Sequence, residues 1–135
     1  MARKTLKQLE KERNDNLQKE KKRLAKIFKK IPKDSYNVAK NLIENVAFMS
    51  IILDELMQEI SKSKFVVKTK NGSQTFSKES PLLTTYNKMY ANFQKGIQAL
   101  ISLVPQSSQP DLKEDDEFME FMRNKNAKVW KEKLY

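Results

Sequence analysis

Two long segments of the chain repeat apolar residues at spacings of three and four, and this pattern constrains the fold more than any other feature. The first runs from about residue 36 to residue 61 and the second from residue 81 to residue 104. Such spacing places the apolar residues on one side of an α-helix, where they form a seam that packs against another helix. The sequence therefore predicts an all-α fold built on two long helices that pack antiparallel as a helical hairpin.

The two seams supply the predicted core. The first seam begins at Val38 and the second ends at Val104. Further apolar residues widen the surface of the first helix, which predicts that this helix is central and buried on two sides. These flanking residues are Ala39, Ile43, Phe48, Ile51 and Ile52. The seam residues that we assign to the core or to oligomer contacts are Leu42, Val46, Met49, Leu53, Leu56, Ile60, Tyr86, Met89, Phe93, Ile97 and Leu100.

Prolines and small polar residues mark where these helices begin. Pro32 ends a preceding helix, and Asp34 or Ser35 can then cap the first long helix with a side-chain oxygen. Ser80 followed by Pro81 predicts the start of the second, because proline is tolerated at the first helical position.

The connection between the long helices changes character. Strand-forming residues at 65–69 and at 75–76 flank Asn71-Gly72, a dipeptide typical of two-residue β-hairpin turns. The sequence favours a short β-hairpin at about 65–76, and a plain helix–helix connection is the alternative.

The C-terminal part is polar at its start and charge-segregated afterwards. Pro105 ends the second long helix, and residues 106–110 are predicted to be a linker. The tail at 111–135 is acidic in its first half and basic in its second, with aromatic residues such as Phe118, Phe121 and Trp130. We expect a helical tail that docks on the body, on a neighbouring subunit or on a partner.

The N-terminal segment is strongly basic. Residues 1–30 hold twelve basic and four acidic residues, a net charge of +8, whereas the whole chain carries +10. Leu24, Ile27, Phe28 and Ile31 form one apolar stripe, so the second half of this helix should dock on the body while the first half forms a basic arm. The candidate DNA-binding residues are Arg3, Lys4, Lys7, Lys11, Arg13, Lys19, Lys21, Lys22, Arg23, Lys26, Lys29 and Lys30.

The composition argues against an enzyme. The chain has no cysteine and no histidine, so it lacks the usual zinc ligands and the commonest general base. It has two glycines, too few for a phosphate-binding loop. We expect no metal and no cofactor, and we interpret the acidic cluster 115–117 as a helix start. The longest apolar stretch, 46–53, is too short to span a membrane, and neither a membrane role nor secretion is expected.

The charge favours a polyanionic partner, nucleic acid first. Lysine and arginine neutralise phosphates and give affinity with little sequence information. Two other classes stay open: a generic DNA- or RNA-binding regulatory or nucleoid-type protein, and a helical scaffold whose basic arm serves only solubility.

The order of several motifs resembles the small terminase subunits of cohesive-end siphophages. The run Leu53-Asp54-Glu55-Leu56 is followed by Asn71-Gly72, then by Ser80-Pro81 and Tyr86-Asn87, and finally by Leu103-Val104-Pro105 with Ser107-Ser108. The resemblance covers residues 36–110. The arginine that often follows the last motif in that family is replaced by Gln109-Pro110.

This resemblance implies a non-catalytic function in the host bacterial cytoplasm. Such subunits form ring-like homo-oligomers, bind double-stranded viral DNA at the packaging start and deliver it to the terminase large subunit, an ATPase and nuclease. It divides the chain into a basic N-terminal helix (1–33), a hairpin core and oligomerisation domain (34–105), a linker (106–110) and a charged-aromatic tail (111–135). The two seams would then also form part of the subunit contacts, and the tail would contact the large subunit.

Overall fold

The computed structural model describes residues 3–62, 66–71, 74–79 and 81–123. In chain order the elements are α1 (Leu6–Ile27), a 3₁₀ turn η1 (Lys33–Ser35), α2 (Tyr36–Lys62), β1 (Val66–Asn71), β2 (Gln74–Glu79), α3 (Pro81–Leu103), a second 3₁₀ turn η2 (Gln106–Ser108) and α4 (Gln109–Glu114). Residues 116–123, which we call the tail helix, are also helical. The fold is all-α with one inserted β-hairpin, as predicted.

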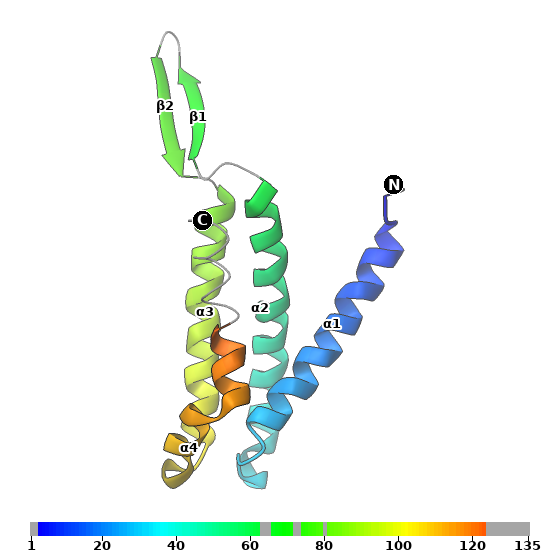
Figure 1. Cartoon of the computed structure of the whole chain (residues 1–135), viewed down its shortest axis with the longest axis vertical. Helices are drawn as coiled ribbons and strands as arrows, with labels where there is room; N and C mark the ends of the chain where they lie inside the picture. Colours follow the sequence, from blue (N-terminus) through cyan, green and yellow to red (C-terminus); the bar gives the residue numbers. More distant parts are fainter. Residues whose placement is uncertain (1–2, 63–65, 72–73, 80, 124–135) are drawn as a thin grey trace.

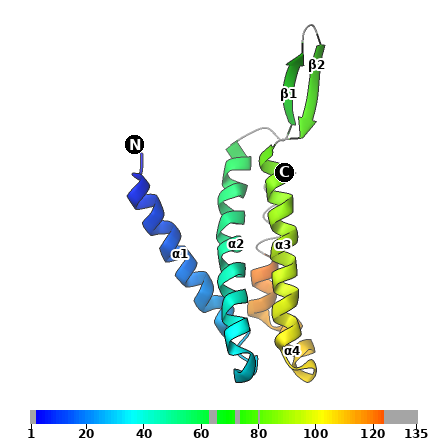
Figure 2. The ribbon, with the colours of Figure 1, turned by 180° about the vertical axis from the view of Figure 1, so that it is seen from behind.

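The helical hairpin of α2 and α3 forms the centre of the molecule, and α1 lies beside α2 (Figure 1). Both views show α1 crossing the lower end of α2 and diverging toward its N-terminus, which stands apart from the hairpin (Figure 2). The β-hairpin extends beyond the opposite end of α2 and α3. The first half of α1 is therefore a projecting element.

The predicted seams pack against each other. Val46 and Leu53 of α2 and Phe93, Ile97 and Leu100 of α3 are almost fully buried. The two helices approach closely at Gly96, where an added Cβ would lie 2.6 Å from Cγ2 of Val46. Because glycine has no side chain, it permits this approach in the middle of α3.

The prediction that α2 is buried on two sides is correct, but two of its apolar residues were placed wrongly. Ala47 and Ile51 are buried on the side of α1, whereas Phe48 is 46% exposed and Val38 is 56% exposed. Val38 lies eight residues before Val46, which is about 80° away around a helix with 3.6 residues per turn. Ala39, seven residues before Val46, is buried instead.

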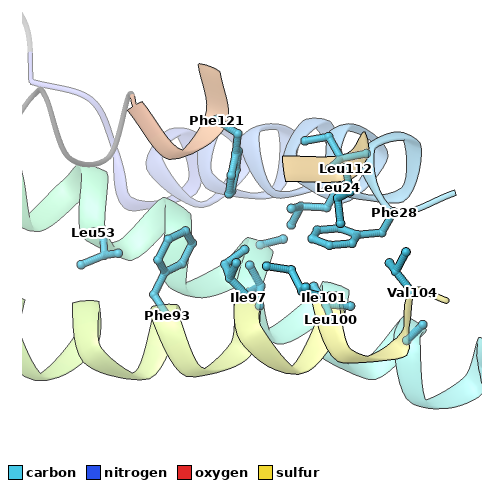
Figure 3. Packing of buried hydrophobic residues seen from close by; sticks show 14 of the residues in the cluster. Leu24, Phe28, Leu53, Phe93, Ile97, Leu100, Ile101, Val104, Leu112 and Phe121 are labelled. Atoms are coloured by element: carbon cyan, nitrogen blue, oxygen red, sulfur yellow. The ribbon is translucent and has the colours of Figure 1, made fainter. Parts of the chain in front are cut away.

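A single hydrophobic core joins segments that the sequence divides into separate regions. Leu24, Ile27 and Phe28 of α1, Leu112 of α4 and Phe121 of the tail helix belong to the same cluster as the α2 and α3 seams. Figure 3 shows Phe121 facing Phe93, and Leu112 beside Leu24 and Phe28. Each such buried side chain contributes about 1.5–3 kcal/mol of transfer free energy.

Two local predictions about helix ends differ from the structure, and a third falls on a residue that the structure does not describe. The first helix ends at Ile27 rather than at Ile31, because the ring of Pro32 clashes with the carbonyl four residues earlier, that of Phe28. Asp34 and Ser35 do not stand at an N-cap but lie within η1, whose N-cap is Pro32. Ser80, the predicted cap of α3, lies outside the described residues.

The segment 106–110 is not a linker, contrary to the prediction. It forms η2 and the first turn of α4, and Pro110 occupies a position in that turn where the missing N–H is not needed. The side-chain Nε2 of Gln109 donates a hydrogen bond to the backbone carbonyl of Val104 at 2.9 Å, which connects the start of α4 to the end of α3.

The predicted β-hairpin is present, a few residues further along than expected. β1 and β2 pair antiparallel, with Val66 opposite Glu79 and Asn71 opposite Gln74. The turn residues 72–73 lie outside the described residues.

Candidate nucleic-acid interface

The basic helix α1 begins at a capping box that the sequence analysis did not identify. The side chain of Thr5 accepts a hydrogen bond from the backbone N–H of Gln8 at 3.2 Å, and Gln8 Oε1 accepts one from the N–H of Thr5 at 2.9 Å. These bonds satisfy backbone groups that a helix start leaves free. The spacing of Thr5 and Gln8 was the signal that could have located this helix start.

The two halves of α1 have different environments. Leu24, Ile27 and Phe28 are buried, whereas Leu6 is 81% exposed and Leu9 is 47% exposed. The prediction that the second half docks on the body is confirmed, and the first half projects into solvent (Figure 1). Its basic side chains are therefore accessible along the projecting length.

Two of the candidate DNA-binding residues connect α1 to α2. Arg13 donates from Nε and Nη2 to the two carboxylate oxygens of Glu55, at 2.8 and 2.5 Å, and this bond raises the pKa of Arg13. Lys21 lies 3.8 Å from the carboxylate of Glu44. Both residues hold the basic helix against the hairpin, and their charge is partly compensated.

Two more of the candidate DNA-binding residues, Lys26 and Arg23, connect α1 to the tail helix. Lys26 Nζ lies 2.9 Å from Glu117 Oε1, and the hydrogen bond with Glu117 raises the pKa of Lys26. The guanidinium of Arg23 lies 5.2 Å from the ring centre of Phe121, within the range of a cation–π contact, and 3.8 Å from Glu20. A fifth, Lys4, pairs with Glu12 along α1 at 2.5 Å.

The seven other candidate DNA-binding residues have no ion pair among the residues that the structure describes. They are Arg3, Lys7, Lys11, Lys19, Lys22, Lys29 and Lys30, and all are exposed.

Four of these seven lie on one side of the basic helix and of the turn that follows it. Lys7, Lys11 and Lys22 recur at spacings of four and eleven, which correspond to nearly whole numbers of helical turns. Lys29 lies in the turn after α1 and lines the same groove as Lys22. We call these four residues the lysine stripe. From Lys7 to Lys22 it extends for about 22 Å at 1.5 Å per residue. Asp15 lies on the same side between Lys11 and Lys22, so this row is net positive rather than purely basic, and a net-positive row of this length suits the phosphates of a nucleic-acid backbone.

The side of α1 that faces α2 has the opposite character. The crevice between the projecting half of α1 and the end of α2 is lined by five carboxylates and three basic residues. A nucleic acid would be repelled from this crevice, so the candidate interface is the lysine stripe. Of its four residues, Lys7 and Lys11 lie on the projecting half of α1, and Lys22 and Lys29 line a second groove between α1 and α2. The crevice carboxylates belong to Glu12, Glu20, Asp54, Glu55 and Glu59.

The residues predicted to serve both the core and oligomer contacts are used within one chain. Val46, Leu53, Ile60, Tyr86, Phe93, Ile97 and Leu100 are buried in it. Leu42, Met49, Leu56 and Met89 are half-buried and pack on the same cluster. The described seams therefore leave little apolar surface for a second subunit.

The acidic cluster at 115–117 is a helix start, as predicted. Asp115 Oδ1 accepts a hydrogen bond from the backbone N–H of Glu117 at 3.1 Å, and Glu117 pairs with Lys26. Across the described ranges, no three acidic side chains lie close enough together to hold a metal ion. Trp130, which the sequence places among the aromatic residues of the tail, lies outside the described residues.

Lys40 is the basic residue that the sequence analysis missed. It lies exposed on α2 and lines a groove together with Lys21, Lys22 and Lys29 of the basic segment. Only the packing of α1 against α2 brings these lysines together, so no sequence pattern could have found the group.

Comparisons with protein-family models, with curated proteins and with solved structures find no match to this chain. None of the helices in the described ranges combines the length and the apolar character that crossing a membrane requires.

Proposed function

We propose that this protein is a non-catalytic nucleic-acid-binding protein, and specifically the small subunit of a bacteriophage terminase. In this role it binds double-stranded viral DNA at the packaging start and delivers it to the large ATPase and nuclease subunit. The observation that carries the proposal is the lysine stripe, whose four exposed lysines have no ion pair among the described residues and of which Lys7 and Lys11 lie on the projecting half of α1. The specific family rests on the motif resemblance over residues 36–110.

The separation of the basic residues into paired and unpaired sets supports this proposal. A basic arm that served only solubility would need no such division. Here Arg13 and Lys21 fix α1 to α2, while Lys7 and Lys11 remain exposed on the projecting half. The paired residues hold the helix in a fixed orientation, and the unpaired residues are available for phosphates.

One observation favours a second candidate, a monomeric DNA- or RNA-binding regulatory protein. Both apolar seams are used in the core of a single chain, whereas a terminase small subunit needs contacts between copies. The mass in solution separates the two candidates: a closed ring supports the terminase subunit, and a monomer supports the regulator.

The variant Lys7→Glu/Lys11→Glu tests the interface in the full chain. We expect fluorescence anisotropy with duplex DNA to show weaker binding for any sequence. We also expect the slope of log affinity against log salt to fall by about two, because each lost phosphate contact removes about 0.9. The matched control is Lys88→Glu/Lys95→Glu, which changes the same charge on exposed residues of α3. Equal losses in both variants would show that only net charge matters and would contradict a localised interface.

A further inference from the structure

A groove between α1 and α2 combines an apolar floor with a positively charged rim. Its volume is about 420 Å³. The floor is formed by small and apolar side chains, among them Ala25, Phe28, Ile31, Ala39 and Ile43. The rim carries Lys21, Lys22, Lys29 and Lys40, with Glu44 as the single acidic lining residue. We call this feature the lysine-rimmed groove.

An apolar floor with a lysine rim fits a partner surface that has an exposed apolar side chain with carboxylates beside it. Besides the lysines and Glu44, the lining has one polar side-chain group, the hydroxyl of Tyr36, so a nucleic-acid backbone would use the rim and leave most of the floor uncovered. An apolar side chain would cover the floor, and flanking carboxylates would pair with lysines from both walls. Such paired charges fix the register of a contact and exclude other partners.

The tail helix presents a surface of this kind. Met119 and Glu120 lie three and four residues after Asp116, which places all three on one side of the helix, and all three are exposed. Met119 is 43% exposed although it is a large apolar residue. The opposite side of the same helix is occupied, because Phe121 is buried against Phe93 and Phe118 packs edge-to-face on Phe28.

The tail helix of a chain does not fill that chain's own groove. None of its residues lines the groove. It is held on the body by Phe121, which contacts Phe93 and Arg23, and by the pair between Glu117 and Lys26. The tail helix that fits this groove must therefore be that of another copy.

We propose that the lysine-rimmed groove of one copy receives the Asp116–Met119–Glu120 face of a second copy. The two surfaces differ, so the contact is head-to-tail and repeats from copy to copy. Contacts of this type form rings when the rotation closes. This inference deepens the proposed function, because it supplies the subunit contact that the buried seams do not.

The contact also divides the lysine stripe. Lys22 and Lys29, at the groove, would face the acidic residues of the neighbouring copy. Lys7 and Lys11 lie beyond the groove on the projecting half of α1 and stay available for DNA. Assembly and DNA binding therefore depend on different lysines.

Charge reversal on either face tests the contact in the full chain without DNA. The groove variant is Lys29→Glu/Lys40→Glu, and the tail variant is Asp116→Lys/Glu120→Lys. We expect each alone to weaken self-association at least about tenfold in sedimentation velocity, because like charges then meet. An equimolar mixture should recover assembly, since each variant still offers a complementary face to the other. Lys88→Glu/Lys95→Glu, with the same charge change away from both faces, should assemble like the unmodified chain.

Several outcomes would overturn the proposal. They are an unmodified chain that stays monomeric at every concentration, a groove variant that assembles normally, or two impaired variants that do not recover when mixed. A groove variant that assembles normally but loses DNA binding would show that the groove holds nucleic acid. The tail variant also separates this proposal from the proposed function, because it keeps Lys7 and Lys11. If it loses assembly but still binds duplex DNA in fluorescence anisotropy, both proposals are supported. Normal assembly of a chain that binds no DNA would contradict the function alone.

Discussion

At the scale of single residues, Ser50 and Glu20 form a polar contact inside the junction of α1 and α2. Ser50 is fully buried, and its hydroxyl donates a hydrogen bond to Glu20 Oε2 at 2.6 Å. We expect Ser50→Ala to lower the free energy of unfolding by about 1–3 kcal/mol, because a half-buried carboxylate loses a donor. Ser102→Ala is the matched control, since Ser102 is exposed and bonds only the carbonyl of Gln98 among the described contacts. Chemical denaturation measures both, and equal effects would contradict this assignment.

The buried Tyr86 makes the stability of the core depend on pH in the alkaline range. Burial raises the pKa of Tyr86 to about 12, and the charges of Tyr90 and Asp54 act in the same direction. An unfolded tyrosine ionises near pH 10, so this contribution to stability is complete below pH 10 and is lost as the pH rises from about 10 to about 12. Tyr86→Phe should therefore flatten the fall of stability in this range. Unfolding curves measured at stepped pH provide the test, and an equally steep fall would contradict it.

At the scale of elements, the bidentate pair of Arg13 and Glu55 connects the middle of α1 to α2. Both side chains are about half-exposed, so we expect Arg13→Gln to cost less than about 1 kcal/mol of global stability. The effect should instead be local: amide hydrogens in the first half of α1 should exchange faster, while those near Leu24 stay protected. Lys11→Gln, which removes an unpaired charge two residues away, should leave exchange unchanged. Uniformly faster exchange over α1 would show that the helix depends on this pair as a whole.

The elements that could be predicted from the sequence are those with strong local patterns. The bounds of α2 and α3 follow from their apolar spacing and from Pro81 and Pro105, and Asn71-Gly72 predicted the hairpin. One wrong expectation concerned 106–110, where the polar composition gave no sign of a 3₁₀ turn and of the hydrogen bond from the Gln109 side chain to the carbonyl of Val104. The lysine-rimmed groove could not be predicted, because it exists only where α1 and α2 meet.

For the candidate site, too, the sequence predicted what depends on local composition and missed what depends on tertiary packing. Sequence composition identified the basic segment, but it could not separate paired residues from unpaired ones. Arg13 and Glu55 are 42 positions apart, and Lys26 and Glu117 are still further apart. Such pairs depend on the tertiary packing of α1, so the sequence assigned Arg13 and Lys7 the same role although the structure gives them different environments.

At the scale of the whole molecule, the single core predicts that the chain unfolds as one unit rather than as arm, hairpin and tail. Phe121 of the tail helix is 1% exposed and contacts Phe93 of α3. We expect Phe121→Ala to cost about 3 kcal/mol and to lower the melting temperature of the entire chain by roughly 10 °C. Met119→Ala, on the exposed side of the same helix, should change it little at concentrations where the chain is monomeric. Calorimetry shows whether the tail helix unfolds with the rest of the chain. If the tail were independent, it would melt first and the main transition would stay at the same temperature. With a shared core, the single transition moves to lower temperature and the calorimetric and van't Hoff enthalpies stay equal.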